Sequence, residues 1–210
     1  TVCLQLDHVN YSYGAAKIRV LSDVNADFEF GKMYAITGPS GAGKSTLLSL
    51  LAGLDAPSDG VVRFEGEDIV TTGYSRHRRE HVSLVFQDHN LIDYLTPEEN
   101  LRLVNPKADM KILEDLGLSR EESKRNIMHL SGGQRQRVAV GRALVAPGRA
   151  ILADEPTGNL DPEMTDEVIN LLRHAAHQLG KCVIVVTHSK RVAGSADAVY
   201  TLRRKKLAKA

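Results

Sequence analysis

The sequence predicts an α/β fold in which a mostly parallel sheet forms the core, with an antiparallel β region at the N-terminus and a small helical subdomain. Two apolar runs, Ala150–Asp154 and Cys182–His188, lack polar–apolar alternation, as expected for parallel strands that are buried on both faces. The glycine-rich segment Gly38–Thr46 lies between an apolar run and a leucine-rich run, which is a strand–loop–helix order. Residues 96–129 instead carry helical patterns and lack β-branched runs.

The N-terminal third is expected to form strands joined by turns. Leu4–Val9 alternates between apolar and polar residues, and Val24–Phe30 places its apolar residues on one face. A Gly-Lys turn then leads into a strand over Met33–Thr37, and the leucine-rich run Ser45–Leu54 predicts a helix. Two further strands are predicted over Val61–Phe64 and His81–Phe86.

The pattern of the C-terminal part alternates between helices and strands. A helix is expected from Gly132 to about Ala146, before the strand Ala150–Asp154. A second helix begins at Pro162, with Asp161 as its N-cap. One apolar stripe is predicted on this second helix, formed by Met164, Val168, Leu171, Leu172, Ala175 and Leu179.

The composition excludes several classes of protein. Lys and Arg total 27 against 26 Asp and Glu, without the basic excess that is typical of nucleic-acid binders. No stretch approaches the roughly 18 apolar residues of a membrane-spanning helix, and the first residues lack the features of a secretory signal. Cys182 opens an apolar run and is expected to be a buried, reduced residue of a cytoplasmic protein.

The segment GPSGAGKST at Gly38–Thr46 fits the phosphate-binding loop pattern G-x-x-x-x-G-K-[ST]. Its glycines allow successive backbone N–H groups to point at phosphate oxygens, next to a helix N-terminus. Lys44 would reach the β- and γ-phosphates, and the Ser45 hydroxyl would bind Mg²⁺. The pattern therefore predicts a P-loop NTPase core. The residues expected to bind the nucleotide are Gly38, Ser40, Gly41, Ala42, Gly43, Lys44, Ser45 and Thr46.

Two adjacent carboxylates follow the strand Ala150–Asp154. The carboxyl end of a buried parallel strand lies where α/β sheets bind ligands, beside the phosphate-binding loop. Asp154 is therefore expected to support Mg²⁺, and Glu155 to polarise a water molecule aimed at the γ-phosphate. Without the loop, the same pair would be interpreted as an N-cap and a surface charge.

The second motif is LSGGQRQR at Leu130–Arg137. With the phosphate-binding loop, it makes the chain resemble the ATP-binding subunit of an ATP-binding-cassette (ABC) transporter over nearly its whole length. The resemblance implies that Ser131, Gly132, Gly133 and Gln134 close over the γ-phosphate bound by the loop of a second copy, so that a homodimer encloses two ATP molecules. Backbone N–H groups at a helix start suit an anionic phosphate.

Four smaller matches support the resemblance and imply further roles. Gln87 resembles the glutamine that contacts Mg²⁺ and the attacking water, and His188 resembles the histidine that holds the γ-phosphate. Asp161 resembles the aspartate that crosses the dimer interface. Tyr13 resembles the aromatic residue that stacks on adenine, with Tyr11 as the competing candidate.

The stretch DEPTGNLD at 154–161 resembles the branch that serves lipoprotein-releasing, macrolide- and peptide-exporting and cell-division permeases. The resemblance implies an ATPase that drives a polytopic membrane permease, with a peripheral position on the cytoplasmic face of the membrane. An ATP-switched regulatory or assembly protein is the alternative. A chromosome-maintenance ATPase is disfavoured, because no heptad coiled coil lies between the two motifs.

The resemblance also divides the chain. Residues 1–210 are expected to form one domain, with 1–95 and 130–210 as the nucleotide-binding core and about 96–129 as the helical subdomain. This insert is shorter than the usual one, and Gly141 stands where the family more often has alanine. The short insert bears on the permease, because in the family it forms part of the docking groove.

Overall fold

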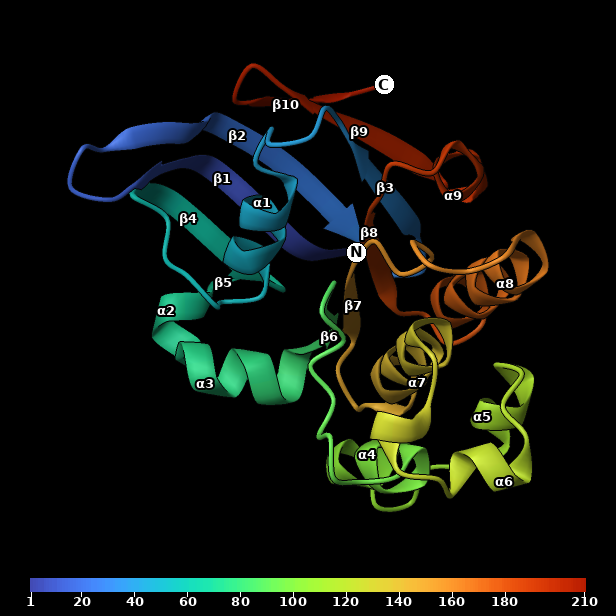
Figure 1. Ribbon diagram of the computed structural model, residues 1–210. Coiled ribbons are helices and arrows are strands. Elements are labelled where there is room, and N and C mark those ends of the chain that lie inside the picture. Colours follow the sequence, from blue (N-terminus) through green and yellow to red (C-terminus); the bar gives the residue numbers. More distant parts are fainter.

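The computed structural model describes residues 1–210 and contains two β-sheets (Figure 1). The first is antiparallel, with the strand order β2-β1-β4-β5. It confirms the predicted β region at the N-terminus. Its strands are β1 (Val2–Tyr13), β2 (Ile18–Glu29), β4 (Asp59–Phe64) and β5 (Glu67–Asp68).

The second sheet has the order β10-β9-β3-β8-β7-β6. All neighbouring strands from β9 to β6 pair in parallel, and only β10 is antiparallel to its neighbour. The predicted parallel core is confirmed. Its strands are β3 (Met33–Thr37), β6 (Val82–Val85), β7 (Ala150–Asp154), β8 (Cys182–Val186), β9 (Ala198–Arg203) and β10 (Lys206–Lys209).

The longer helices cover the parallel sheet, and the shorter ones lie in connections. No helix is both long enough and apolar enough to span a lipid bilayer. A π-helical turn (His77–His81) and a 3₁₀ turn (Ile127–His129) complete the helical elements. The α-helices are α1 (Lys44–Leu51), α2 (Ile69–Thr72), α3 (Tyr74–Arg76), α4 (Pro97–Val104), α5 (Lys111–Asp115), α6 (Arg120–Ser123), α7 (Gly132–Val145), α8 (Pro162–His177) and α9 (Lys190–Ser195).

Two hydrophobic cores lie on opposite faces of the parallel sheet. Along β7, Leu152 packs into the core shared with α1 and the antiparallel sheet, whereas Ile151 and Ala153 pack into the core under α7 and α8. Strand β8 divides in the same way, with Ile184 on one face and Val183 on the other. This two-sided burial explains why neither strand alternates in sequence.

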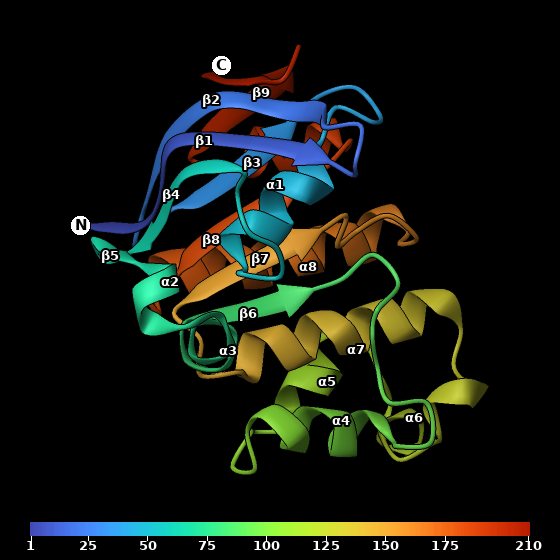
Figure 2. The same cartoon turned by 90° about the vertical axis from the view of Figure 1, so that its left-hand side faces the viewer.

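Helices α4, α5 and α6 lie at the end of the molecule away from the antiparallel sheet, with α7 between them and strands β6 and β7 (Figure 2). Leu101, Leu113 and Leu116 from this insert belong to the same core as α7 and the sheet face. A Cβ atom at Gly141 would lie 3.0 Å from Leu116 Cδ1. Glycine at this position therefore lets α5 and α7 pack closely.

Several predictions of detail differ from the structure. Helix α8 ends at His177, so Leu179, the last residue of the predicted stripe, lies beyond the helix and is 59% exposed. Helix α1 spans Lys44–Leu51 rather than Ser45–Leu54, but it is closed near Gly53 as the sequence predicts, since Gly53 has a left-handed φ of 68°. Cys182 is buried with a free thiol, as the sequence predicts.

Candidate functional site

The loop Gly38–Gly43 joins β3 to α1 at the carboxyl end of the parallel sheet. Gly38 has a φ of 148°, and a Cβ atom there would lie 2.3 Å from the Leu202 backbone oxygen. Gly43 has a φ of 101°, and its Cβ atom would lie 2.6 Å from Val20 Cγ1. Both positions therefore need glycine, for the left-handed backbone and for close contact with neighbouring strands.

The loop has the polar groups that a phosphate needs. The backbone N–H groups of Gly41, Gly43 and Lys44 have no hydrogen-bond acceptor within the protein. The buried Lys44 side chain curls over the loop, where its Nζ donates to the carbonyl oxygens of Gly38 at 2.8 Å and Pro39 at 2.9 Å. Unpaired N–H groups next to a cation at a helix N-terminus form an anion site.

The predicted magnesium residues lie beside the loop. Ser45 Oγ donates to Asp154 Oδ2 at 2.7 Å, which joins the first turn of α1 to the end of β7. Gln87, two residues beyond β6, lines the same cavity of about 400 Å³. The remaining lining residues are Tyr13, Val20, Ser40, Gly41, Gly43, Lys44, Thr46, Glu155, Val186 and His188.

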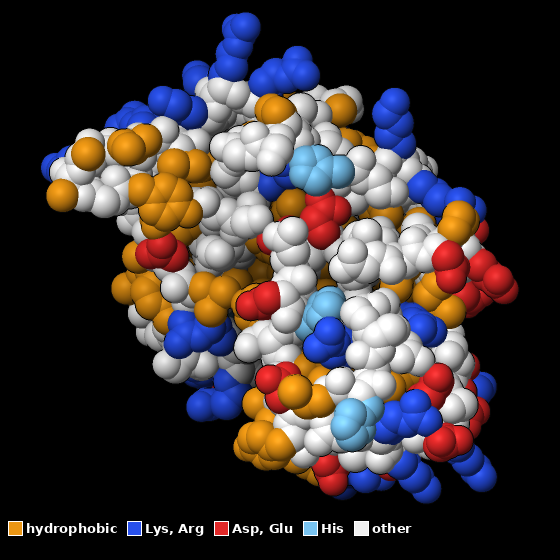
Figure 3. Space-filling model, in the orientation of Figure 1, with side chains coloured by type: hydrophobic (Ala, Val, Ile, Leu, Met, Phe, Trp, Pro, Cys, Tyr) orange, Lys and Arg blue, Asp and Glu red, His pale blue; other side chains and the backbone are white.

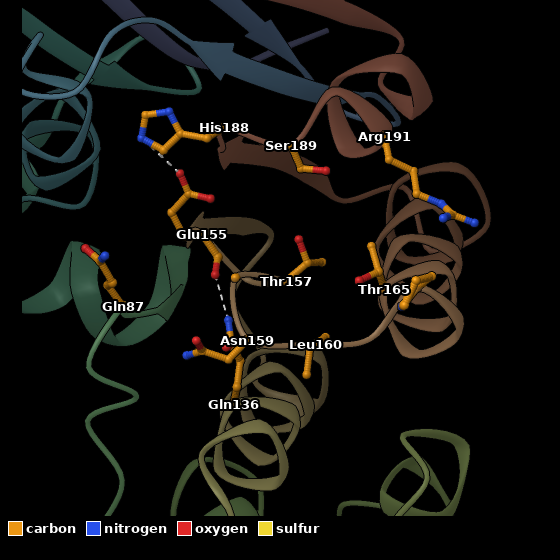
Figure 4. Close-up of a pocket in the computed structure, with 12 residues that line it drawn as sticks. Gln87, Gln136, Glu155, Thr157, Asn159, Leu160, Thr165, His188, Ser189 and Arg191 are labelled. Carbon is orange, nitrogen blue, oxygen red and sulfur yellow. Dashed lines mark hydrogen bonds and ion pairs between the residues drawn. The ribbon is translucent and has the colours of Figure 1, made fainter.

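Glu155 lies where this cavity meets a second one of about 650 Å³ (Figure 4). Its Oε1 atom is buried without a hydrogen-bond partner and lies 3.5 Å from Nε2 of His188. Burial raises the pKa of Glu155, and the nearby His188 opposes this shift. A partly desolvated carboxylate beside a cavity is suited to orient water or accept a proton.

The molecular surface shows the same arrangement. On the face seen in Figure 3, acidic and histidine side chains gather around the middle, whereas most lysine and arginine side chains lie at the periphery. In the close-up of the larger cavity, Glu155 and His188 point toward one another (Figure 4). Because carboxylates repel a phosphate, acidic groups beside a phosphate site are compatible with phosphate binding only together with cationic side chains or a metal ion.

The two tyrosine candidates differ in environment. Tyr13 is 48% exposed, lines the loop cavity and places its hydroxyl 2.6 Å from Thr46 Oγ1. Tyr11 is 7% exposed and donates to Asp55 from within the core. Only Tyr13 is free to stack on a bound base.

The residues predicted to act on a second nucleotide lie outside both cavities. Ser131 is exposed as the N-cap of α7, where its Oγ accepts from the Gln134 backbone and Gln134 Oε1 accepts from the Ser131 backbone. Gly132 and Gly133 form the first turn of α7. Asp161 caps α8 as predicted, with its Oδ1 accepting from the Met164 backbone at 2.8 Å.

One buried polar residue next to the site was not predicted. Gln136 is 2% exposed and donates from Nε2 to the Glu155 carbonyl at 2.6 Å (Figure 4). The sequence does carry a signal for it. Gln136 begins the i, i+3, i+4, i+7 series that continues with the buried residues Ala139, Val140 and Ala143, so a polar side chain stands on an apolar helix face.

Comparison with known proteins supports the family that the motifs indicate. The family model described as ABC transporter matches residues 21–158. The chain is 37% identical to the uncharacterized ABC transporter ATP-binding protein YclH of Bacillus subtilis (strain 168), over 96% of its own length and 93% of YclH. It is 39% identical to the lipoprotein-releasing system ATP-binding protein LolD of Shewanella oneidensis, over 96% of the chain and 94% of LolD.

The macrolide export ATP-binding/permease protein MacB of Escherichia coli (strain K12) is 38% identical over 97% of the chain, which spans only 33% of MacB. Among solved structures, the chain superposes on a dimeric post-hydrolysis state of the ATP-binding cassette MJ0796 bound to ADP and Pi. The TM-score is 0.89, with 32% identity and 98% of each chain covered. The predicted branch, fold and activity class are confirmed, and the chain belongs to the ABC transporter family as one of its ATP-hydrolysing cassettes.

Proposed function

We propose that two copies of the chain bind two ATP molecules between them and, through closure and reopening, drive a separate membrane permease. The observation that carries this proposal is the separation of two phosphate-binding elements within one chain. The phosphate-binding loop lines a cavity, whereas the exposed helix start at Ser131 belongs to neither cavity beside it. The dimeric state of the MJ0796 cassette supports completion of each site by a second copy.

In the proposed site, the loop N–H groups and Lys44 bind the phosphates, and Tyr13 stacks on the base. The oxygen-bearing side chains of Ser45, Gln87 and Asp154 fit Mg²⁺, because this ion prefers oxygen ligands and is commonly held by few protein groups together with substrate phosphates. When bound, Mg²⁺ would neutralise part of the negative charge on the phosphates.

Hydrolysis in this proposal depends on the buried carboxylate. Glu155 orients a water molecule and accepts its proton, while His188 and Lys44 stabilise charge on the transferring phosphoryl group. Ser131, Gly132, Gly133 and Gln134 of the second copy complete the γ-phosphate site, and Asp161 lies at the dimer interface. Most of the rate acceleration then comes from positioning and electrostatics.

The names of the relatives indicate what the ATP hydrolysis drives. LolD is named for lipoprotein release and MacB for macrolide export, and MacB joins an ATP-binding part to a permease in one protein. We therefore infer a polytopic permease as the partner, with this chain peripheral on the cytoplasmic face of the membrane. The names of these relatives favour transport over the regulatory alternative.

The Glu155→Gln substitution tests the hydrolytic role. The amide keeps the size of the side chain but cannot accept the proton, so we expect turnover to fall by about 10²-fold or more while ATP affinity is retained. Glu167→Gln, at an exposed position of α8, is the matched control and should leave turnover unchanged. ATP hydrolysis by Glu155→Gln at the wild-type rate would refute the role of Glu155.

A further inference from the structure

The backbone of Glu155 has an unusual conformation. Its φ is 48°, in the left-handed region. For a residue with a Cβ atom this conformation is less stable than a right-handed or extended one, and it persists only where the surroundings hold it. The direction of the Glu155 side chain follows from this backbone, so whatever holds the backbone also aims the carboxylate.

Three hydrogen bonds hold the Glu155 backbone. Its N–H donates to the Val186 carbonyl at 2.9 Å, which extends the pairing of β7 with β8. Its carbonyl accepts from the Gly158 N–H at 3.2 Å, within the same turn, and from Gln136 Nε2 at 2.6 Å. The bond from Gln136 is the one contributed by a side chain, and it comes from a different element, helix α7.

Gln136 occupies a position where packing alone favours an apolar residue. It is 2% exposed, on the helix face that buries Ala139, Val140 and Ala143. Its Nε2 donates to the Glu155 carbonyl, whereas its Oε1 is buried and makes only a loose contact with the His89 side chain. A buried amide destabilises the fold unless its polar atoms are paired, and the bond to Glu155 is the one hydrogen bond of good geometry that the Gln136 side chain makes.

We propose that Gln136 is a positioning residue for Glu155. Its amide fixes the left-handed backbone and thereby aims the carboxylate at the cavity wall toward His188, with Glu155 Oε1 3.5 Å from His188 Nε2. This inference rests on the proposed role of Glu155 in hydrolysis. The geometric part of the proposal, in which Gln136 holds the turn at Glu155, does not depend on nucleotide binding or hydrolysis.

The geometric part is tested by amide hydrogen exchange on the nucleotide-free protein. Gln136→Met keeps a side chain of similar length but has no donor, and Gln136→Leu also removes the donor and is the smaller of the two replacements. We expect exchange at the Glu155 and Gly158 amides to become about 10-fold faster or more in both variants, which is about 1.4 kcal/mol. Exchange at Leu152, inside β7, should not change.

Gln178→Met is the matched control, because Gln178 lies exposed at the end of α8. Unchanged exchange at Glu155 and Gly158 in both Gln136 variants would overturn the proposal. If Gln136→Met exchanges faster throughout β7, it has loosened the fold. Gln136→Leu then decides, because its exchange is either faster only at residues 155–158, as the proposal requires, or unchanged there.

The mechanistic part is tested by a double-mutant cycle on ATP turnover. Gln136→Met alone should lower kcat about 10- to 100-fold with KM nearly unchanged, because a small misplacement of a catalytic group has effects of this size. In the Glu155→Gln background, the same substitution should have no further effect, because Gln136 acts only through Glu155. A further loss of the same size in that background would show an independent role and overturn the proposal.

The two kinds of failure can be told apart. If the Gln136 variants exchange faster at Glu155 but the wild-type chain does not hydrolyse ATP, the geometric role of Gln136 is supported and the proposed function is refuted. Hydrolysis that depends on Glu155 but not on Gln136 would keep the proposed function and refute the positioning role.

Discussion

At the scale of single residues, Tyr13 stands at the end of β1 with its ring half exposed beside the phosphate-binding loop. The pairing of β1 with β2 shifts register on either side of Tyr11. Two residues that regular alternation would place on one face therefore differ, with Tyr11 in the core and Tyr13 at the cavity. A ring in the position of Tyr13 can stack on a base at the mouth of the cavity.

Tyr13→Ala should therefore weaken ATP binding without a large loss of stability. Base–aromatic stacking contributes about 1–3 kcal/mol in alanine substitutions, so the Kd for ATP is expected to rise about 10-fold. Tyr11→Phe, which loses the bond to Asp55 in the core, should lower the unfolding midpoint and leave the Kd unchanged. Equilibrium titration with ATP measures the Kd of each variant, and urea unfolding measures its midpoint. A Kd that changes in Tyr11→Phe but not in Tyr13→Ala would reverse the assignment.

At the scale of elements, a pair of histidines links the π-helical turn to the phosphate-binding helix. His77 is fully buried, and its Nε2 lies 2.9 Å from the Leu51 carbonyl at the end of α1. Since a carbonyl only accepts, Nε2 carries the proton, and His77 Nδ1 accepts from His81 Nδ1 at 3.2 Å. His81 in turn stacks on Phe64 with ring centroids 4.1 Å apart.

This pair predicts a loss of stability in acid. Burial lowers the pKa of His77 below its usual 6.5, with His81 and Arg78 acting in the same direction and the Leu51 carbonyl opposing. The unfolded chain then takes up a proton more readily than the folded chain, so the stabilisation by neutral His77 is lost as the pH falls through about 6.5. The pKa of His81 is also lowered, by burial and by Arg76, whereas Glu80, Glu65 and Glu67 act in the opposite direction.

We expect the urea midpoint of the wild type to fall between pH 7 and pH 5.5. His77→Leu should fall less, because its side chain does not titrate. Urea unfolding at the two pH values measures the difference. An equal fall in both proteins would show that His77 does not carry the effect. His174→Leu, at an exposed position of α8, is the control.

The elements also show what the sequence could and could not predict. Parallel strands were predictable because Ala150–Asp154 and Cys182–Val186 are apolar at every buried position, and this pattern is local. The π-helical turn was not predicted, because its polar residues show no period and their contacts come from distant elements. The Gln136–Glu155 bond joins residues whose proximity depends on how α7 packs against the sheet, and no local pattern reports it.

At the scale of the whole molecule, the predicted site divides into two sets. One cavity is lined by all of the predicted loop residues except Gly38 and Ala42, together with Asp154, Glu155, Gln87, His188 and Tyr13, because each follows a strand that ends at the same edge or lies beside it. Ser131, Gly132, Gly133, Gln134 and Asp161 line neither of the cavities beside Glu155. Their roles stay predictions that depend on a second copy of the chain.

Light scattering on the Glu155→Gln protein, with and without ATP·Mg²⁺, tests this central claim most directly. Blocked hydrolysis should keep the closed state, so we predict a dimer that forms only with ATP·Mg²⁺ and that Ser131→Arg abolishes. Ser75→Arg, on the exposed surface of α3, is the matched control and should leave the dimer intact. A protein that binds ATP yet remains monomeric, or a dimer indifferent to Ser131→Arg, would contradict the account.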